Sequence, residues 1–305
     1  MRMGNIYLMS LTFPSQGNAE MTEVHRSSHA NVIKEKISGY LRLMRVQNCL
    51  IAIMASLTGN LIGGGITLLP HLVPFLYCAG GMVLNDYFDY ELDRINRPDR
   101  PIPSGIVSRE SALFFSSVLF LIGSIILIFS GGALTVSIGI VAMLMLVVYN
   151  WKMKREGGII GNVMVSSLTA MTFLYGGSLS GSLEMPLLFS AIAFFAMTGR
   201  EIVKDIEDAL GDSAFNVKSL PITRGEEFSR RVASLFMSLA VILALIPVTL
   251  SINVVVYSIL VSPSLICYAY SVLSLIRGGD VKLISKVTKW SVVPAILAFL
   301  GGVLV

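Results

Sequence analysis

Charged side chains are scarce in this sequence. Asp, Glu, Lys and Arg make up 14% of the 305 residues, whereas 54% are hydrophobic. A soluble domain usually carries about 25% charged residues. The apolar residues form repeated runs of roughly 20 residues, which a soluble core could not hide. The composition therefore excludes an ordinary soluble domain and predicts an all-α protein that crosses the membrane several times.

Cysteine and histidine are rare too, with three of each. None of them has the spacing of a metal site. The cysteines fall in apolar runs, so we expect small core residues at Cys49, Cys78 and Cys267. The sequence also lacks a P-loop pattern, which argues against nucleotide hydrolysis. These absences leave carboxylates, arginines and lysines as the groups able to carry chemistry.

Nine apolar runs are long enough to span a membrane as helices. We place them at residues 47–68, 71–93, 111–130, 133–150, 159–178, 186–208, 232–250, 254–275 and 289–305. Several contain internal glycines, and small residues let membrane helices approach closely. Polar residues recur at helical spacing on the fifth run, and we expect them to be packing contacts between helices: Asn162, Ser166 and Thr169.

Charge is divided unequally between the two sets of loops. All 23 Lys and Arg residues fall in the N-terminal segment or around the loops after the second, fourth, sixth and eighth spans. All 19 acids except Glu184 share that side. Cytoplasmic loops of membrane proteins carry an excess of Lys and Arg. We therefore expect a multi-pass protein of the cell membrane with a cytoplasmic N-terminus.

The first 38 residues are polar and lack the order of features of a signal peptide. We expect residues 1–38 to be a poorly ordered tail ahead of a single transmembrane domain at 39–305. Within the approach to the first span, residues 31–45 have amphipathic spacing. This stretch is expected to form a helix on the cytoplasmic membrane surface.

Two clusters of acids end the second and sixth spans. A spacing of three and then four residues occurs twice, 119 positions apart: Asp86, Asp89 and Asp93, then Asp205, Asp208 and Asp212. This predicts a duplicated unit with motifs at 85–93 and 205–212. On a helix, such spacing places each set of acids on one face.

Acids so close together repel one another unless a cation neutralises them. Hard oxygen ligands suit Mg²⁺ or Ca²⁺ rather than zinc, and Mg²⁺ is typically held by one or two carboxylates plus substrate phosphates. Two facing clusters predict two Mg²⁺ ions bridged by a diphosphate, with nearby Arg and Lys binding the same anion. The acids expected to bind the metal are Asp86, Asp89, Asp93, Asp205, Asp208 and Asp212.

The sequence NDYFDYELDRINRPDRP resembles the first aspartate-rich motif, N-D-x-x-D-x-x-x-D, of the UbiA superfamily of intramembrane prenyltransferases, and KDIEDALGD resembles the second. The likeness covers roughly residues 40–305. In YLRLMRVQNCL, YNWKMKREGGIIGN and GREIVKDIEDALGD the sequence is most similar to archaeal digeranylgeranylglyceryl phosphate synthases.

The resemblance implies a fold of nine transmembrane helices around a central cavity open at the cytoplasmic side. It also implies Mg-dependent transfer of a geranylgeranyl group from geranylgeranyl diphosphate to the hydroxyl of geranylgeranylglyceryl phosphate, in archaeal ether-lipid synthesis. The partners expected are the prenyl diphosphate, the lipid-phosphate acceptor and the bilayer. Neither nucleic acid nor a protein partner is expected.

The resemblance assigns roles to individual residues, and it implies Asn85 as a further metal ligand. The expected catalytic set is Asp89, Asp93, Asp208, Asp212 and Tyr149. The expected diphosphate-binding set is Asn85, Arg97, Arg100, Lys152, Lys154, Arg45, Asn48 and Lys204. The spacing leaves open whether Lys152 or Lys154 contacts the diphosphate. A phosphorylated acceptor would need one more basic contact, for which the candidates are Arg42, Lys152 and Lys154.

Two other functions fit parts of the pattern. An aromatic prenyltransferase of quinone synthesis would use the same diphosphate site to alkylate a ring carbon, as in 4-hydroxybenzoate. A divalent-cation transporter would use the acids as ligands along a path through the membrane. The transporter predicts acids on both sides, yet only Glu184 lies across from the rest.

Overall fold

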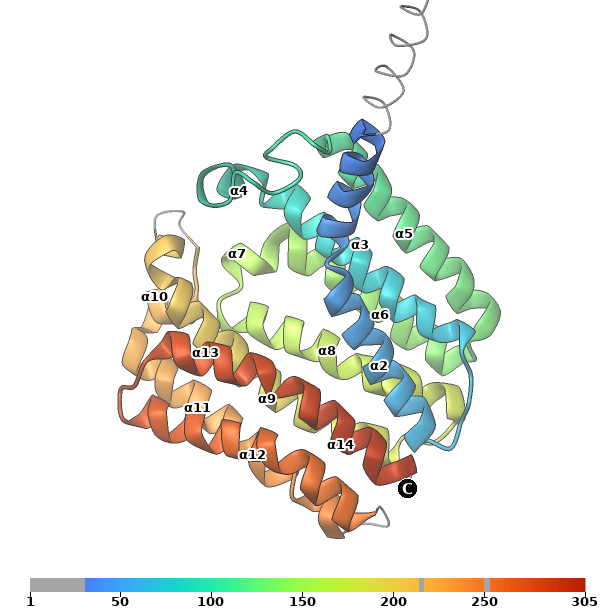
Figure 1. Cartoon of the computed structure of the whole chain (residues 1–305), viewed down its shortest axis with the longest axis vertical. Coiled ribbons are helices and arrows are strands. Elements are labelled where there is room, and N and C mark those ends of the chain that lie inside the picture. The colour runs from blue at the N-terminus through green and yellow to red at the C-terminus, as the bar shows by residue number, and fades with distance from the viewer. Residues whose placement is uncertain (1–30, 214–216, 250–252, 305) are drawn as a thin grey trace, which may run out of the picture.

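The computed structural model describes residues 31–213, 217–249 and 253–304, and every regular element in these ranges is helical (Figure 1). The all-α prediction is therefore confirmed for the described chain. Most of the expected tail, residues 1–30, lies outside the described residues, so its order stays a prediction. Residues 31–44 form a helix, as their spacing predicts.

Helices follow one another through the chain with short connections. The first half contains α2 (Val46–Ile62), α3 (Leu72–Phe88), α4 (Tyr90–Asn96), α5 (Arg109–Ser130), α6 (Ala133–Val148), a π-helical turn (Tyr149–Met153), α7 (Lys154–Glu156) and α8 (Ile159–Ser180). The second half contains α9 (Glu184–Ser213), α10 (Leu220–Arg224), α11 (Glu226–Leu243), α12 (Val254–Ile276), α13 (Val281–Trp290) and α14 (Val292–Leu304). Short 3-10 turns lie at Leu69–His71 and Ile246–Thr249.

Seven helical stretches of the described chain are long and apolar enough to cross a membrane. They are residues 109–130, 133–156, 159–180, 184–209, 226–249, 254–276 and 281–302. The helices α2 and α3 have 17 residues each, so the total of nine spans stays a prediction. Helix α2 ends at Ile62 because three glycines follow. Gly64 has φ 85°, a left-handed conformation that glycine adopts without steric cost.

Two expected spans are interrupted in the structure. The expected helix 71–93 breaks at Asp89, between α3 and α4. The last span, expected at 289–305, begins instead at Val281, and a break at Ser291 separates α13 from α14. The lysines expected in the loop before that span are therefore exposed on α13: Lys282, Lys286 and Lys289.

Backbone lies against backbone where α2 crosses α8. A Cβ on Gly59 would lie 2.1 Å from the Phe173 carbonyl oxygen. A Cβ on Gly176 would lie 1.8 Å from the Ser56 carbonyl oxygen. Both distances are far shorter than a van der Waals contact, so only glycine fits at either position. Helix α8 also packs on α9, and α9 packs on α11, which joins the two halves of the molecule (Figure 1).

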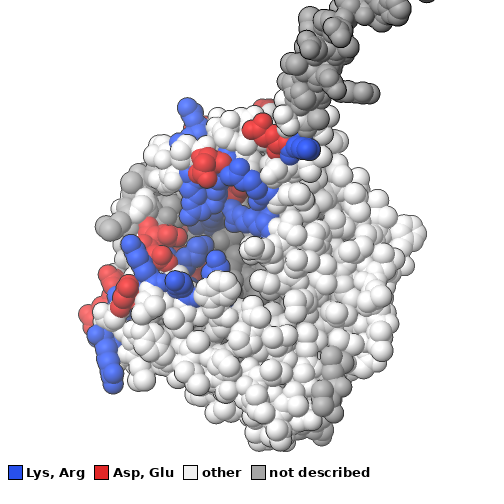
Figure 2. Space-filling model, in the orientation of Figure 1, with Lys and Arg blue, Asp and Glu red and all other residues white. Residues whose placement is uncertain are grey.

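Charged side chains gather on one part of the visible surface. Figure 2 shows them around a hollow, over the region of α4, α7 and α10, whereas the rest of that face is almost free of charge. Elsewhere large apolar side chains are exposed, including Leu121 (60%), Ile128 (62%) and Phe129 (86%). So much exposed apolar surface marks contact with other molecules. On helices of this length and hydropathy, the natural contact is the lipid chain region of a bilayer.

Candidate active site

Asp86, Asp89 and Asp93, here called the first acid cluster, lie where α3 passes into α4. Each of the three is only 4% exposed. Although the helix is interrupted at Asp89, the hydrogen bonds continue through it. The amide of Asp89 donates to the Asn85 carbonyl (2.9 Å), and that of Asp93 donates to the Asp89 carbonyl (2.8 Å). The three carboxylates therefore share one side of the chain, which confirms the predicted helix face.

Two arginines neutralise the ends of the first acid cluster. Arg45 Nη2 lies 2.7 Å from Asp86 Oδ1. Arg100 Nη1 reaches both Asp86 Oδ1 (3.2 Å) and Asp93 Oδ2 (2.5 Å). Arg45 is the only described residue other than glycine with a positive φ, 49°, and it occupies the junction between the helix 31–44 and α2. A strained backbone of this kind costs about 1–3 kcal/mol and tends to occur at functional sites.

Two further cations neutralise the middle of the cluster. Lys154 Nζ contacts Asp89 Oδ2 directly. Arg155 Nη2 lies 3.5 Å from Asp89 Oδ1 and donates to the Phe88 carbonyl oxygen at 2.9 Å. Arg155 was missing from the residues expected in the site. Its position next to Lys154 was the only signal in the sequence that could have indicated it.

The π-helical turn Tyr149–Met153 separates the two candidate lysines. The Lys154 amide donates to the Tyr149 carbonyl oxygen, the i to i+5 bond of a π-helix, and its Nζ contacts Asp89. Lys152 points elsewhere, because its side chain is 52% exposed and pairs with Glu156 at 3.7 Å. In the structure, Lys154 is therefore the lysine that reaches the acids. Single π turns inside α-helices are often found at functional sites.

Asn150 joins this turn to the helix that carries the acids. It is 7% exposed, and its amide nitrogen donates to the carbonyl oxygens of Gly81 (3.2 Å) and Leu146 (2.9 Å). Its amide oxygen accepts from Asn85 Nδ2 at 3.1 Å. Asn85, expected as a metal ligand, therefore uses its nitrogen to bind Asn150 one turn before Asp89. Asn150 was also missing from the expected site.

The second set of expected acids lies along α9. Asp205 Oδ2 accepts a hydrogen bond from Asn162 Nδ2 at 2.8 Å. This bond joins α8 to α9, so Asn162 makes the contact between helices that its spacing predicts, and its partner is one of the expected metal ligands. Asp208 is exposed, and the side chain of Asp212 lies outside the described residues.

The other two polar residues of α8 make hydrogen bonds within the helix and not between helices. Ser166 donates to the Asn162 carbonyl at 2.7 Å, and Thr169 donates to the Val165 carbonyl at 3.2 Å. Both bonds stay within the helix, so these two hydroxyls are used in local structure.

Glu201 extends the acidic face of α9 by one turn. It precedes Asp205 by four residues, and its side chain is 12% exposed. Arg200 Nη1 lies 2.8 Å from its Oε1, and Lys204 Nζ lies 3.8 Å from its Oε2. Lys204 therefore pairs with Glu201 in this structure. We call Glu201, Asp205 and Asp208 the second acid cluster.

The duplication does not extend to Glu201. The residue 119 positions earlier is Met82, so the first repeat carries a thioether where the second carries a carboxylate. Met82 Sδ lies 3.5 Å from Arg45 Nη1 and 3.9 Å from Asn48 Nδ2. Asn48 is exposed, and its amide donates to the Arg45 carbonyl at 2.8 Å.

Tyr149 links the two acid clusters electrostatically. Its hydroxyl interacts with Asp89 of the first cluster and with Glu201 and Asp205 of the second. Lys154 likewise interacts with Lys204 on α9. The elements that carry the clusters are also in contact, because the π-helical turn packs on both α3 and α8, and Asn162 of α8 binds Asp205.

Some expected site residues lie apart from the first acid cluster. Arg97 is exposed and forms no ion pair with a described residue. Arg42 binds the backbone oxygen of Asp99 at 2.7 Å, away from the acids. Within the ranges that the structure describes, no three His, Cys, Asp or Glu side chains form a group that could hold a metal ion. The carboxylates of the first acid cluster contact arginine and lysine instead.

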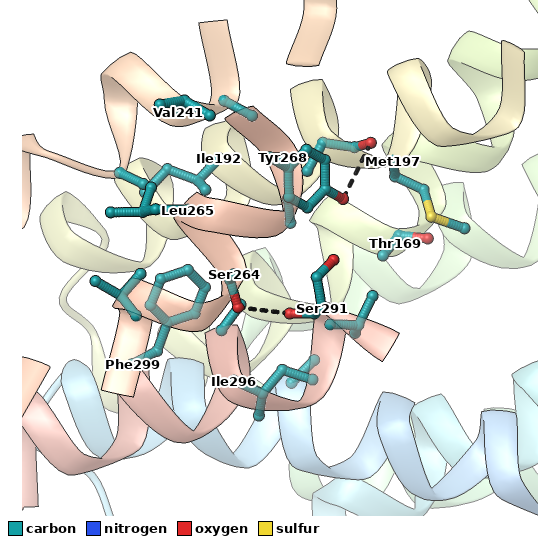
Figure 3. A pocket seen from close by; sticks show the side chains of 18 of the residues that line it. Thr169, Ile192, Met197, Val241, Ser264, Leu265, Tyr268, Ser291, Ile296 and Phe299 are labelled. Atoms are coloured by element: carbon teal, nitrogen blue, oxygen red, sulfur yellow. Dashed lines mark hydrogen bonds between the residues drawn. The ribbon is translucent and has the colours of Figure 1, made fainter. Parts of the chain in front are cut away.

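An apolar cavity of about 110 Å³ lies between α2, α8, α9, α11, α12 and α14 (Figure 3). Its walls are almost entirely hydrocarbon. The polar groups on them bind the protein itself: Ser264 donates to the Ser291 carbonyl at 2.6 Å, and the Tyr268 hydroxyl reaches the Ala196 carbonyl at 3.5 Å. A cavity with such walls suits a hydrocarbon chain.

The cavity begins next to the charged site. On α2, Ile51 lines it and follows Arg45 by six residues; on α9, Met197 lines it and precedes Glu201 by four. At 1.5 Å per residue these separations are about 9 Å and about 6 Å along the helices. A charged headgroup at the acid clusters could therefore extend its chain into the cavity.

Comparison with known proteins agrees with these features. The model of the UbiA prenyltransferase family matches residues 48–293. The digeranylgeranylglyceryl phosphate synthase of Thermococcus kodakarensis is 36% identical over 279 residues, covering 88% of this chain and 99% of that protein. The enzyme of the same name from Methanopyrus kandleri is 36% identical over 277 residues, covering 87% and 99%.

Solved structures show the same fold. A structure described as digeranylgeranylglyceryl phosphate synthase in membranes superposes with a TM-score of 0.75 at 35% identity, covering 88% of this chain and 99% of the other. A UbiA homolog from Archaeoglobus fulgidus, bound to GPP and Mg²⁺, gives a TM-score of 0.67 at 20% identity, covering 88% and 100%.

The match therefore spans nearly the whole chain at substantial identity. It agrees with an all-helical fold, with several helices able to span a membrane, and with paired aspartate-rich motifs beside an apolar cavity. This chain is a multi-pass membrane protein and belongs to the UbiA prenyltransferase family.

Proposed function

We propose that this chain transfers a geranylgeranyl group from geranylgeranyl diphosphate to the hydroxyl of geranylgeranylglyceryl phosphate, giving digeranylgeranylglyceryl phosphate. The observation that carries the proposal is a buried acid cluster, bordered by cations, at the end of an apolar cavity. The relatives named above support this acceptor. The site faces the cytoplasm in this proposal, because the Lys and Arg residues gather on its side of the membrane.

The donor residues fit Mg²⁺, which the proposal requires. Asp86, Asp89 and Asp93 offer buried carboxylate oxygens, the ligands that Mg²⁺ prefers. Asp205 and Asp208 offer the same chemistry across the site. We assign one ion to each cluster, with Asp212 and Asn85 as further ligands. When bound, the ions supply Lewis-acid stabilisation of the charge that grows on the departing diphosphate.

The cations of the first acid cluster have a second role in this proposal. Arg45, Arg100, Lys154 and Arg155 neutralise the carboxylates now and are the donors best suited to phosphate oxygens. When the diphosphate binds, these side chains are placed to donate to its oxygens. Because they are already held at the site, little reorganisation is needed as the C–O bond breaks.

The remaining residues protect and orient the prenyl group. Tyr149 lies between the clusters, where the face of its ring can stabilise the positive charge that develops on the allylic carbon. The apolar walls exclude water, which would otherwise capture that carbon. The acceptor oxygen then forms the new C–O bond, and the hydroxyl proton leaves to a carboxylate or to the diphosphate.

The acceptor decides between this proposal and its nearest rival. Purified protein with Mg²⁺ and geranylgeranyl diphosphate should convert geranylgeranylglyceryl phosphate to the diether product, and should leave 4-hydroxybenzoate unchanged. Radiolabelled donor and separation of the products by chromatography would measure both. Turnover of 4-hydroxybenzoate alone would contradict the proposal and favour an aromatic prenyltransferase.

Removal of divalent ions is expected to stop the reaction. With excess EDTA the initial rate should fall by about 100-fold or more, because loss of Lewis-acid stabilisation raises the barrier by several kcal/mol. Added Mg²⁺ should restore the rate. Full activity after exhaustive chelation would rule out the assigned role of the two acid clusters.

A further inference from the structure

Arg200 lies at the charged end of the apolar cavity. The preceding turn of α9 contributes Ala196 and Met197 to the cavity wall. The Arg200 side chain is 18% exposed, and its Nη1 lies 4.0 Å from Met197 Sδ. The guanidinium also interacts electrostatically with the hydroxyl of Tyr268, whose ring lines the cavity (Figure 3). Arg200 is therefore a largely buried cation directly beside the hydrocarbon walls.

Arg200 stands apart from the cations assigned to the diphosphate. Those four, Arg45, Arg100, Lys154 and Arg155, contact the first acid cluster. Arg200 instead pairs with Glu201 at 2.8 Å. A guanidinium carries five N–H donors, and among the described residues only Nη1 of Arg200 makes a hydrogen bond. Its Nε and Nη2 are left for a further partner.

The acceptor in the proposed reaction has the chemistry that fits this position. It carries one isoprenoid chain, a hydroxyl and a phosphate monoester on a single glycerol. The cavity wall runs along α14 from Val292 to Phe299, seven residues or about 10 Å, which suits part of a chain. Arginine at the cavity end suits the phosphate, which it can bind with two parallel hydrogen bonds.

We propose that Arg200 binds the phosphate of the lipid acceptor, while the acceptor's isoprenoid chain occupies the apolar cavity. This inference rests on the proposed function. The other basic candidates for this contact are already placed elsewhere. Arg42 binds Asp99 and Lys152 pairs with Glu156, both with side chains about half exposed, while Lys154 contacts Asp89.

Binding of a phosphate would not leave Glu201 without a partner. When the Arg200 guanidinium donates to the phosphate, Lys204 is still available to Glu201, whose Oε2 lies 3.8 Å from Lys204 Nζ. Binding of the phosphate at Arg200 would also position the acceptor for the reaction. A phosphate held at Arg200 keeps the acceptor hydroxyl, only a few bonds away on the same glycerol, next to Tyr149 and the two acid clusters.

The test compares kinetic constants for two acceptors in the full-length protein. Arg200→Ala should raise KM for geranylgeranylglyceryl phosphate by about 10–100-fold, the usual cost of a lost hydrogen bond between charged groups. KM for geranylgeranyl diphosphate should stay within about twofold of wild type. With geranylgeranylglycerol, which lacks the phosphate, wild type and variant should be equally slow.

Two more variants complete the test. Arg231→Ala removes the same charge from an exposed pair with Glu227 on the same side of the protein, and should leave both KM values unchanged. Arg200→Lys keeps the charge beside Glu201 but cannot form two parallel hydrogen bonds to the phosphate. It should therefore raise the acceptor KM by a smaller factor. It provides the measurement if Arg200→Ala fails to fold.

Three results would overturn the inference. They are an unchanged acceptor KM in both Arg200 variants, a rise in the donor KM of similar size, or an equal loss with and without the acceptor phosphate. If the wild type uses 4-hydroxybenzoate but no lipid phosphate, the proposed function fails as well. If the wild type uses the lipid phosphate and Arg200 does not affect it, only this inference fails.

Discussion

Replacement of Lys154 with alanine is expected to lower kcat/KM by about 10²–10³-fold, the usual cost of removing one donor that stabilises developing charge. Lys154 Nζ contacts Asp89, a carboxylate whose side chain is 5% exposed, and is placed to move onto the departing diphosphate. Without it, Asp89 keeps only Arg155, at 3.5 Å. Initial rates over a range of geranylgeranyl diphosphate concentrations would measure the effect.

Lys152→Ala is the matched control for this prediction. Lys152 lies two residues earlier in the chain, but its side chain is 52% exposed and pairs only with the exposed Glu156. Exposed ion pairs contribute little, so the variant should stay within about twofold of wild type. Equal losses in the two variants would show that the π-helical turn does not separate the two lysines.

A second variant separates catalysis from folding. Lys154→Ala leaves a buried carboxylate poorly paired, which by itself destabilises a protein. Lys154→Met combined with Asp89→Asn removes both charges, so it should recover the thermal stability that Lys154→Ala loses. Its activity should remain low. Recovery of both stability and activity would contradict a role for Lys154 in the reaction.

Gly176→Ala is expected to lower the free energy of unfolding by about 3 kcal/mol, a typical cost of overpacking. The added methyl would lie 1.8 Å from the Ser56 carbonyl oxygen and 2.9 Å from the Asn60 amide nitrogen. Both are backbone atoms, so no side chain can rotate away, and α2 must shift as a whole. Thermal unfolding of the purified protein in detergent should show a fall of roughly 5 °C or more.

Gly132→Ala is the control for the glycine prediction. A Cβ at Gly132 meets nothing within 4 Å, and its φ is −71°, which alanine adopts freely. Its unfolding temperature should therefore equal or slightly exceed that of wild type. A fall in Gly132→Ala as large as in Gly176→Ala would show that glycine removal, and not the contact of α2 with α8, causes the loss.

The same contact links packing to the active site. Helix α2 carries Arg45 at its start and contributes Ile51 and Ala55 to the cavity wall. A shift of α2 away from α8 would move the Arg45 guanidinium from Asp86, 2.7 Å away. Gly176 lies on α8, far from the acids along the chain, yet it helps to fix one of their partners. Loss of activity in Gly176→Ala would therefore follow from geometry as well as from stability.

Properties that depend on neighbours along one helix could be predicted from the sequence. The spacing of Asp86, Asp89 and Asp93 was enough to place them on one face, because residues three and four apart lie together on any helix. Apolar runs of membrane length were enough to predict helices, since a backbone in lipid must satisfy its own hydrogen bonds. The repeat 119 residues later indicated a second acidic helix end. The family followed from these motifs.

Contacts between helices were decided only by the tertiary structure. Lys154 reaches Asp89 from the end of the π-helical turn. The sequence could not show this, because such a turn leaves no pattern that differs from ordinary helix spacing. Asn150 and Asn162 gained their roles from the helices packed against them. Glu201 lies one turn before the expected motif, and only the structure shows that its carboxylate interacts with Tyr149 of the π-helical turn. Helical periodicity shows which residues share a face of a helix. Which other helix packs on that face depends on how closely the two backbones can approach. Between α2 and α8, glycines on both helices set this distance.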